Sequence, residues 1–113
     1  MRLTELEPLF IRYESREADE YKVPVPLAEA QGIFFLCPVC FTKNNGPVGT
    51  HGVEVTFRDR GVADDQGSHN TAGEPSRWAV TGTGVEDLTL TPSIHLASSP
   101  CAWHGFITNG EVS

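Results

Sequence analysis

A chain of 113 residues with 39% hydrophobic and 20% charged residues has the composition of a folded protein, and its length favours one domain, residues 1–113. The formal net charge of −7, with no basic stripe, argues against nucleic acid as a partner because phosphates repel an acidic chain. No apolar run approaches the roughly 20 residues of a membrane span. The N-terminus carries acids where a signal peptide has apolar residues, so we expect a cytoplasmic, non-membrane protein.

The first half of the chain predicts short strands separated by polar segments. Alternation from Leu9 to Tyr13 predicts a strand, and the charged residues 14–22 predict one exposed helical turn. Gly32–Leu36 is short, apolar and aromatic, and it gives the strongest strand signal. Residues 42–49 contain Asn, Gly and Pro and predict a polar turn.

The second half continues this pattern. His51–Arg58 alternates between apolar and polar residues, as a half-buried strand does. Residues 59–75 are the longest predicted loop, and residues 78–80 and 88–90 predict two short strands. Asn109-Gly110 near the C-terminus is a tight hairpin signal. We therefore expect a mostly β fold, built as a small single antiparallel domain.

The cysteines fall in two short motifs, Cys37-Pro38-Val39-Cys40 and Cys101-Ala102-Trp103-His104. Each motif has two residues between its end positions, which is the spacing of a zinc knuckle. Three thiolates and one imidazole make a complete tetrahedral ligand set that leaves no open position for a substrate. We therefore expect Cys37, Cys40, Cys101 and His104 to bind a structural Zn²⁺ ion in a zinc-ribbon-like site, with the thiols kept reduced.

A second cofactor is compatible with the C-terminal motif. Cys101-Ala102-Trp103-His104-Gly105-Phe106 resembles the C-terminal cluster loop of Rieske proteins, which is Cys-x-x-His-Gly followed by an aromatic residue. The first motif departs from that family, which has Cys-x-His where this chain has Cys37-Pro38-Val39-Cys40. A 2Fe–2S cluster held by three cysteines and one histidine is chemically possible, so it is the alternative cofactor.

Other histidines and acids are weaker site candidates. His51 and His95 lie near strand ends that are expected to approach the metal. Asp64, Asp65 and His69 share the long loop, where they could bind a second ion or act as acid and base. Solvated loop residues are the simpler interpretation, because acids are common in turns.

Segments spread over most of the chain carry a family resemblance, among them Leu6-Glu7-Pro8, residues 32–41, residues 46–51, Gly82-Thr83-Gly84 and Cys101–Ile107. On these segments the chain resembles small, uncharacterised phage and prophage proteins. It also resembles bacterial domains of unknown function that end in Pro-Ser-Ile and then Cys-x-x-His. The resemblance implies a phage gene acting in the host cytoplasm, and it implies no established activity. Such proteins are often labelled ammonia monooxygenase, a membrane-embedded copper enzyme, but this chain has no candidate membrane span.

The function expected from the sequence is non-enzymatic. Ser93, Ser98 and Ser99 lack a nucleophile-elbow context, so no catalytic residue is expected. We expect a small phage-encoded structural-zinc protein that binds another protein, such as a host, defence or phage component. The alternatives are an iron–sulfur or other metal-dependent redox protein, and a metal-dependent hydrolase that uses the long loop.

Overall fold

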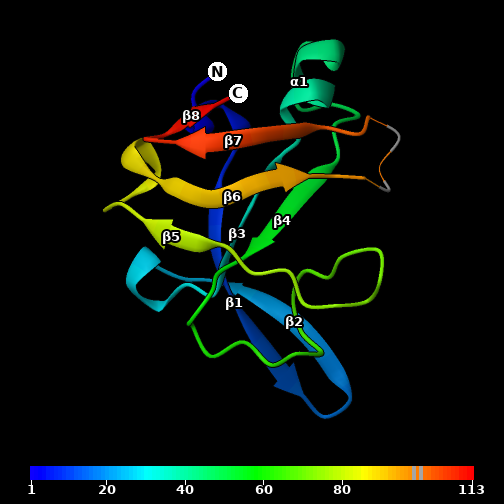
Figure 1. Cartoon of the computed structure of the whole chain (residues 1–113), viewed down its shortest axis with the longest axis vertical. Helices are drawn as coiled ribbons and strands as arrows, with labels where there is room; N and C mark the ends of the chain where they lie inside the picture. Colours follow the sequence, from blue (N-terminus) through cyan, green and yellow to red (C-terminus); the bar gives the residue numbers. More distant parts are fainter. Residues whose placement is uncertain (98, 100) are drawn as a thin grey trace.

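Two antiparallel sheets of four strands each form the framework of the structure, a computed structural model that describes all residues except 98 and 100 (Figure 1). The first sheet has the strand order β2-β1-β3-β4, with β1 (Leu9–Arg16), β2 (Asp19–Pro24), β3 (Gly32–Leu36) and β4 (Gly52–Thr56). The second has the order β5-β6-β7-β8, with β5 (Ala79–Thr81), β6 (Thr89–His95), β7 (His104–Thr108) and β8 (Glu111–Val112). The described residues also form the α-helix α1 (Pro38–Asn44) and the 3-10 helices η1 (Leu3–Leu6), η2 (Leu27–Glu29) and η3 (Val85–Asp87). The mostly antiparallel β fold expected from the sequence is confirmed.

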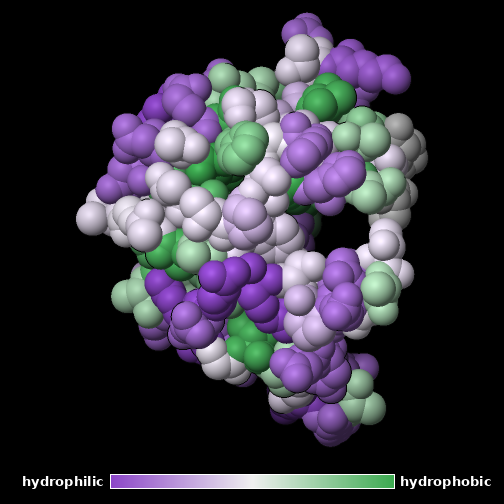
Figure 2. Space-filling view, viewed as in Figure 1, coloured by the Kyte–Doolittle hydropathy of each residue, from purple (hydrophilic) through white to green (hydrophobic). Residues whose placement is uncertain are grey.

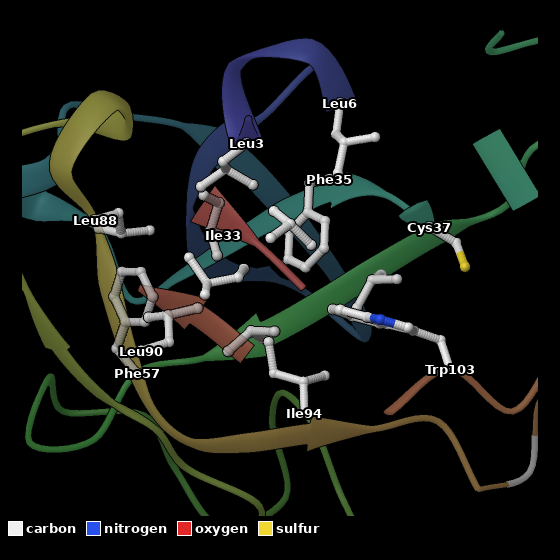
Figure 3. Close-up of a cluster of buried hydrophobic side chains, with 14 of the residues drawn as sticks. Leu3, Leu6, Ile33, Phe35, Cys37, Phe57, Leu88, Leu90, Ile94 and Trp103 are labelled. Atoms are coloured by element: carbon white, nitrogen blue, oxygen red, sulfur yellow. The ribbon is translucent and has the colours of Figure 1, made fainter. Parts of the chain in front are cut away.

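Side chains from both sheets meet in one apolar core (Figure 3). In the first sheet, Ile33 and Phe35 of β3 and Val55 of β4 are completely buried. In the second sheet, Leu90 of β6 and Ile107 of β7 belong to the same cluster. Burying a side chain of this size contributes roughly 1.5–3 kcal/mol, so the core holds the two sheets against each other.

The two clearest strand predictions are confirmed. Gly32–Leu36 is β3, with the expected bounds. The predicted strand at His51–Arg58 contains β4, in which Val53 and Val55 are buried and Glu54 between them is only half-buried. The alternation of apolar and polar residues predicted the buried face of β4 correctly, because successive side chains of a strand point to opposite sides of the sheet.

The predicted helical turn at residues 14–22 is wrong. β1 continues to Arg16 and β2 returns from Asp19, so this charged stretch is an antiparallel hairpin with Glu17 in the left-handed region at its tip. Pairing with β1 satisfies the backbone groups of this stretch, whereas a single isolated helical turn lacks the length to be stable.

Two other segments also differ from the expectation. The polar turn predicted at residues 42–49 overlaps the end of α1. This helix begins at Pro38, and proline is favoured in the first turn of a helix. The strand predicted at residues 88–90 extends through Pro92 to His95. Proline is tolerated there because the pairing of β6 with β7 is irregular between Leu90 and Ile94, so the missing N–H of Pro92 falls where the ladder is already interrupted. No helix of the described residues is long and apolar enough to cross a membrane.

Candidate functional site

The three cysteines lie together with His51. Cys37 Sγ is 3.6 Å from Cys101 Sγ, and His51 Nε2 is 3.3 Å from the same Cys101 sulfur. The ligand atoms of Cys37, Cys40, His51 and Cys101 all lie within 4.8 Å of one another. A tetrahedral zinc ion with Zn–S bonds of about 2.3 Å separates its sulfur ligands by roughly 3.8 Å. The four side chains are therefore close enough to hold one metal ion.

These four residues come from three segments that are distant in the sequence and meet in the fold. Cys37 is the N-cap of α1, and Cys40 lies in the first turn of that helix. The register of β3 and β4 places His51 beside Cys37, whose N–H donates to the His51 carbonyl oxygen over 3.0 Å. Cys101 comes from the segment that precedes β7. A metal at this point would join the end of β3, the start of β4 and the approach to β7.

The pKa values of Cys37 and Cys101 are shifted in opposite directions. Burial raises the pKa of Cys37 to about 11. The Ser99 hydroxyl donates to the Cys101 sulfur over 3.0 Å, and this hydrogen bond is the main cause that lowers the pKa of Cys101 to about 6. The contact with Cys101 also raises the pKa of His51. Without a metal, Cys101 is therefore the first of these two thiols to become a thiolate.

His104, the fourth ligand expected from the motif spacing, lies outside this metal-binding cluster. It is the first residue of β7, and its Nε2 is 3.0 Å from Ser93 Oγ in β6. A nucleophile and its general base are typically 2.6–3.2 Å apart. Ser93 and His104 thus form a candidate Ser–His dyad, and His51 stands where His104 was expected.

His95 packs against the dyad on the same face of the sheet. It pairs with His104 across β6 and β7, and the two imidazole rings stack with centroids 4.6 Å apart and planes at 26°. Leu96 N–H donates to Trp103 O over 2.8 Å, so the adjacent His95–His104 pair is a non-hydrogen-bonded pair of the ladder. Side chains lie closest in such pairs, which explains the stacking.

A cavity of about 970 Å³ opens beside the dyad, which is large enough for a sizeable ligand. Ser93 and His95 of β6 line one side of it, and Val53 of β4, Ser68 and Trp78 line other parts. Figure 2 shows the molecule hollowed between β6 and the long loop. Ser93 lines this cavity and His104 is exposed, so both side chains are accessible rather than sealed in the core.

The long loop, residues 59–75, holds His69 through its own backbone. His69 Nε2 lies 2.6 Å from the Asp64 carbonyl oxygen, and Nδ1 lies 3.0 Å from the Gly67 carbonyl oxygen. Over the described residues, Asp64, Asp65 and His69 do not form a group that could hold a metal. The contacts of His69 are those of a residue that fixes the shape of its loop.

The expectation that no serine is catalytic did not consider a histidine partner for Ser93. It rested on the missing nucleophile elbow, a strand-to-helix turn, whereas Ser93 lies on a strand and meets its histidine across the sheet. Ser99 instead contacts the Cys101 sulfur, and Ser98 lies outside the described residues. The sequence did contain a signal, since the Pro-Ser-Ile and Cys-x-x-His motifs carry Ser93 and His104.

Comparison with known proteins identifies the family. Residues 11–113 match the model of a family described as the serine protease of a bacterial ubiquitination-like system, BubE. The chain belongs to this family. No curated protein and no solved structure gives a significant match.

Membership of the BubE family corrects the function expected from the sequence. The family description is that of a protease, which conflicts with a phage-encoded, non-enzymatic zinc protein whose role is to bind another protein. The sequence reasoning placed His104 among the metal ligands, so it did not pair His104 with a serine. With His51 in the metal-binding cluster, His104 is available to Ser93.

Proposed function

We propose that this chain is a serine protease in which Ser93 is the nucleophile and His104 is the general base. The observation that carries the proposal is the 3.0 Å separation of Ser93 Oγ and His104 Nε2 beside an open cavity. Membership of a family described as a serine protease supports it independently. His95, stacked on His104, restricts the orientation of the base.

The reaction follows from this geometry. The Ser93 hydroxyl gives its proton to His104 Nε2 as its oxygen attacks the carbonyl carbon of the scissile peptide bond. His104 then passes that proton to the leaving amine, and an ester joins the acyl part of the substrate to Ser93. In the second half His104 takes a proton from water, the resulting hydroxide attacks the ester, and the free acid leaves as Ser93 regains its proton.

The family description suggests the kind of protein that is cleaved. It places the protease in a bacterial ubiquitination-like system, so we propose that the substrate is a protein component or conjugate of such a system. The protein partner expected from the sequence is then a substrate. The cavity of about 970 Å³ beside Ser93 lies at the upper end of the range for ligand pockets, so it has room for part of a protein substrate.

We propose that the metal is a structural zinc ion held by Cys37, Cys40, His51 and Cys101. Three thiolates and one imidazole are a typical structural zinc set, and four protein ligands leave no position for substrate. The compact arrangement of ligand atoms favours a single ion over a 2Fe–2S cluster, which spreads its ligands over two irons. Zinc would fix the segment that leads from Cys101 to His104. Because such thiolates need a reducing environment, the proposal includes a cytoplasmic location.

Labelling with a fluorophosphonate probe tests the proposed serine protease. The probe transfers its phosphonate group to an activated serine with loss of fluoride, and it needs no knowledge of the natural substrate. We expect the wild-type protein to be labelled at Ser93. Ser93→Ala should abolish labelling, and His104→Ala should slow it by at least about 100-fold, because general-base catalysis contributes factors of this size.

Ser15→Ala is the matched control, since Ser15 is an exposed serine of β1 in the other sheet. It should label like the wild type. Wild-type labelling at another serine, or labelling that survives Ser93→Ala, would contradict the proposal.

A further inference from the structure

One stretch of β6 has an unpaired backbone edge close to Ser93. Because His95 and His104 form a non-hydrogen-bonded pair, the N–H and C=O of His95 point away from β7. β5, the neighbour of β6 on that side, pairs only with residues 89–91. Within the described part of the chain, neither backbone group of His95 has a hydrogen-bond partner.

The cavity lies along this open edge. Figure 1 shows β5 alongside only the first part of β6, and the cavity is lined by the later residues 93–97 of β6 and the segment that follows it. The Ser93 carbonyl oxygen already accepts a hydrogen bond from Trp78 Nε1 over 3.2 Å. Trp78 therefore closes the end of the cavity nearest β5 and leaves the backbone of His95 as the first open position.

The opposite wall does not offer an equivalent edge. On β4, the Glu54 carbonyl oxygen accepts from Ser68 Oγ over 2.9 Å, and the Thr56 carbonyl oxygen accepts from Trp78 N–H over 2.9 Å. Contacts with the long loop and with Trp78 thus occupy acceptors along the outer edge of β4. The unpaired N–H and C=O of His95 make β6 the edge on which an added strand can form.

We propose that the substrate binds here as an extended peptide that adds a strand to the second sheet next to His95. This inference rests on the proposed protease function and defines its substrate class as an unfolded tail or linker rather than a folded surface. A peptide residue paired with His95 would give its N–H to the His95 carbonyl oxygen and accept from the His95 N–H. Strand addition supplies affinity through the main chain, which is independent of peptide sequence. It holds the chain within two residues of Ser93, where a peptide carbonyl carbon has to be presented.

Peptidyl phosphonates separate this inference from the protease proposal. The probe is a mixture of acetyl-tripeptidyl diphenyl phosphonates with varied residues at each position, which react with an activated serine by loss of phenol. In three further mixtures one backbone N–H is methylated in turn. We expect labelling of Ser93 to fall roughly two- to tenfold, the size of one lost hydrogen bond, and only at alternate positions. Adjacent N–H groups of an extended chain point in opposite directions, so only alternate ones can face His95.

Two protein variants test the same contact from the other side. His95→Ala and His95→Pro both remove the ring that stacks on His104, but only proline removes the backbone N–H. Proline is compatible with this position because the N–H of His95 takes no part in pairing with β7. The readout is the peptidyl-phosphonate labelling rate divided by the fluorophosphonate rate, and this ratio should be several-fold lower for His95→Pro than for His95→Ala.

Each outcome has one meaning. Fluorophosphonate labelling without any labelling by the peptidyl mixture overturns strand addition and leaves the protease proposal intact. Equal losses at all three methylated positions, or equal ratios for the two variants, also overturn strand addition. No labelling by either reagent overturns the protease proposal and this inference with it.

Discussion

Two histidines have different contacts at the residue scale. His51 Nε2 lies 3.3 Å from a cysteine sulfur, which is a ligand position. His104 Nε2 lies 3.0 Å from a serine hydroxyl, which is the position of a base. Metal binding and serine reactivity should therefore depend on different histidines.

Substituting the two histidines separately tests this division. We expect His51→Ala to lose most of its bound zinc because three thiolates remain where four ligands are needed. His104→Ala should retain about one zinc per chain, because His104 lies outside the metal-binding cluster. Elemental analysis of both variants, purified without added metal, gives the answer. Zinc lost from His104→Ala and kept by His51→Ala would restore the ligand set expected from motif spacing.

Thiol reactivity at the metal site should follow the opposite pKa shifts of two cysteines. In metal-free protein, Cys101 has a pKa of about 6 and Cys37 a pKa of about 11. The thiolate is the reactive form, so above pH 6 Cys101 reacts with iodoacetamide, and its rate falls as the pH drops through 6. At pH 7.5 we expect Cys101 to be alkylated before Cys37, as followed by peptide mass spectrometry. Equal rates at Cys37, Cys40 and Cys101 would show that the metal-free site has lost this arrangement.

At the scale of elements, the long loop of residues 59–75 is anchored rather than loosely attached. Ser68 N–H donates to Thr56 Oγ1 over 2.8 Å, and Arg77 donates to the Gln66 carbonyl oxygen over 2.7 Å. Gly67 lies between these contacts with φ +75°, and a Cβ there would overlap the Thr56 side chain. The loop thus forms a fixed wall of the cavity beside β4.

A pair of glycine substitutions measures this anchoring. Gly61→Ala and Gly67→Ala both place a side chain at a positive φ, but only Gly67 has a neighbour within 4 Å. We expect Gly61→Ala to lower the free energy of unfolding by about 1 kcal/mol through backbone strain. Gly67→Ala should lower it by roughly 2–4 kcal/mol, because the clash with Thr56 adds to the strain. Urea denaturation compares them, and equal losses would mean that the loop moves freely away from β4.

At the scale of the whole molecule, the candidate metal site brings together residues that lie next to strands of both sheets. Cys37 and His51 belong to the ends of β3 and β4 in the first sheet, and Cys101 precedes β7 in the second. Among the described residues, the apolar core also joins the sheets, whereas the ion pairs are partly exposed and contribute little. The loss of the metal should therefore affect both folding and the position of His104.

Chelation tests this coupling. A strong zinc chelator should lower Tm by more than about 10 °C, because a loss of only a few kcal/mol shifts the Tm of a domain of this size by that amount. It should also slow fluorophosphonate labelling of Ser93. Cys40→Ser is the control, since a protein already lacking the metal should melt at the same temperature with and without chelator. A wild-type Tm unaffected by chelator would show that the site contributes nothing to folding.

The sequence by itself determined those features that depend on neighbours along the chain. Alternation defined β3 and the buried face of β4, because the side-chain period of a strand is a local property. The Cys37–Cys40 spacing predicted that two thiols would approach one another, because two intervening residues make a tight turn whatever the rest of the fold. The extended hairpin of β1 and β2 escaped prediction, because its charged residues gain their structure only from pairing.

Only the tertiary structure decided which histidine lies with the cysteines and which serine lies beside a histidine. The pairing of β3 with β4 brings His51 to Cys37, although the helix α1 separates the two residues along the chain. No local spacing in the sequence encodes that contact. His104 lies close to Cys101 in sequence, yet as the first residue of β7 it stacks on His95 and reaches Ser93. The contacts of a side chain in a sheet depend on which strand pairs with its own strand and on which face of the sheet it lies. The two residues between Cys101 and β7 could not carry that information, because it resides in the pairing of β6 with β7.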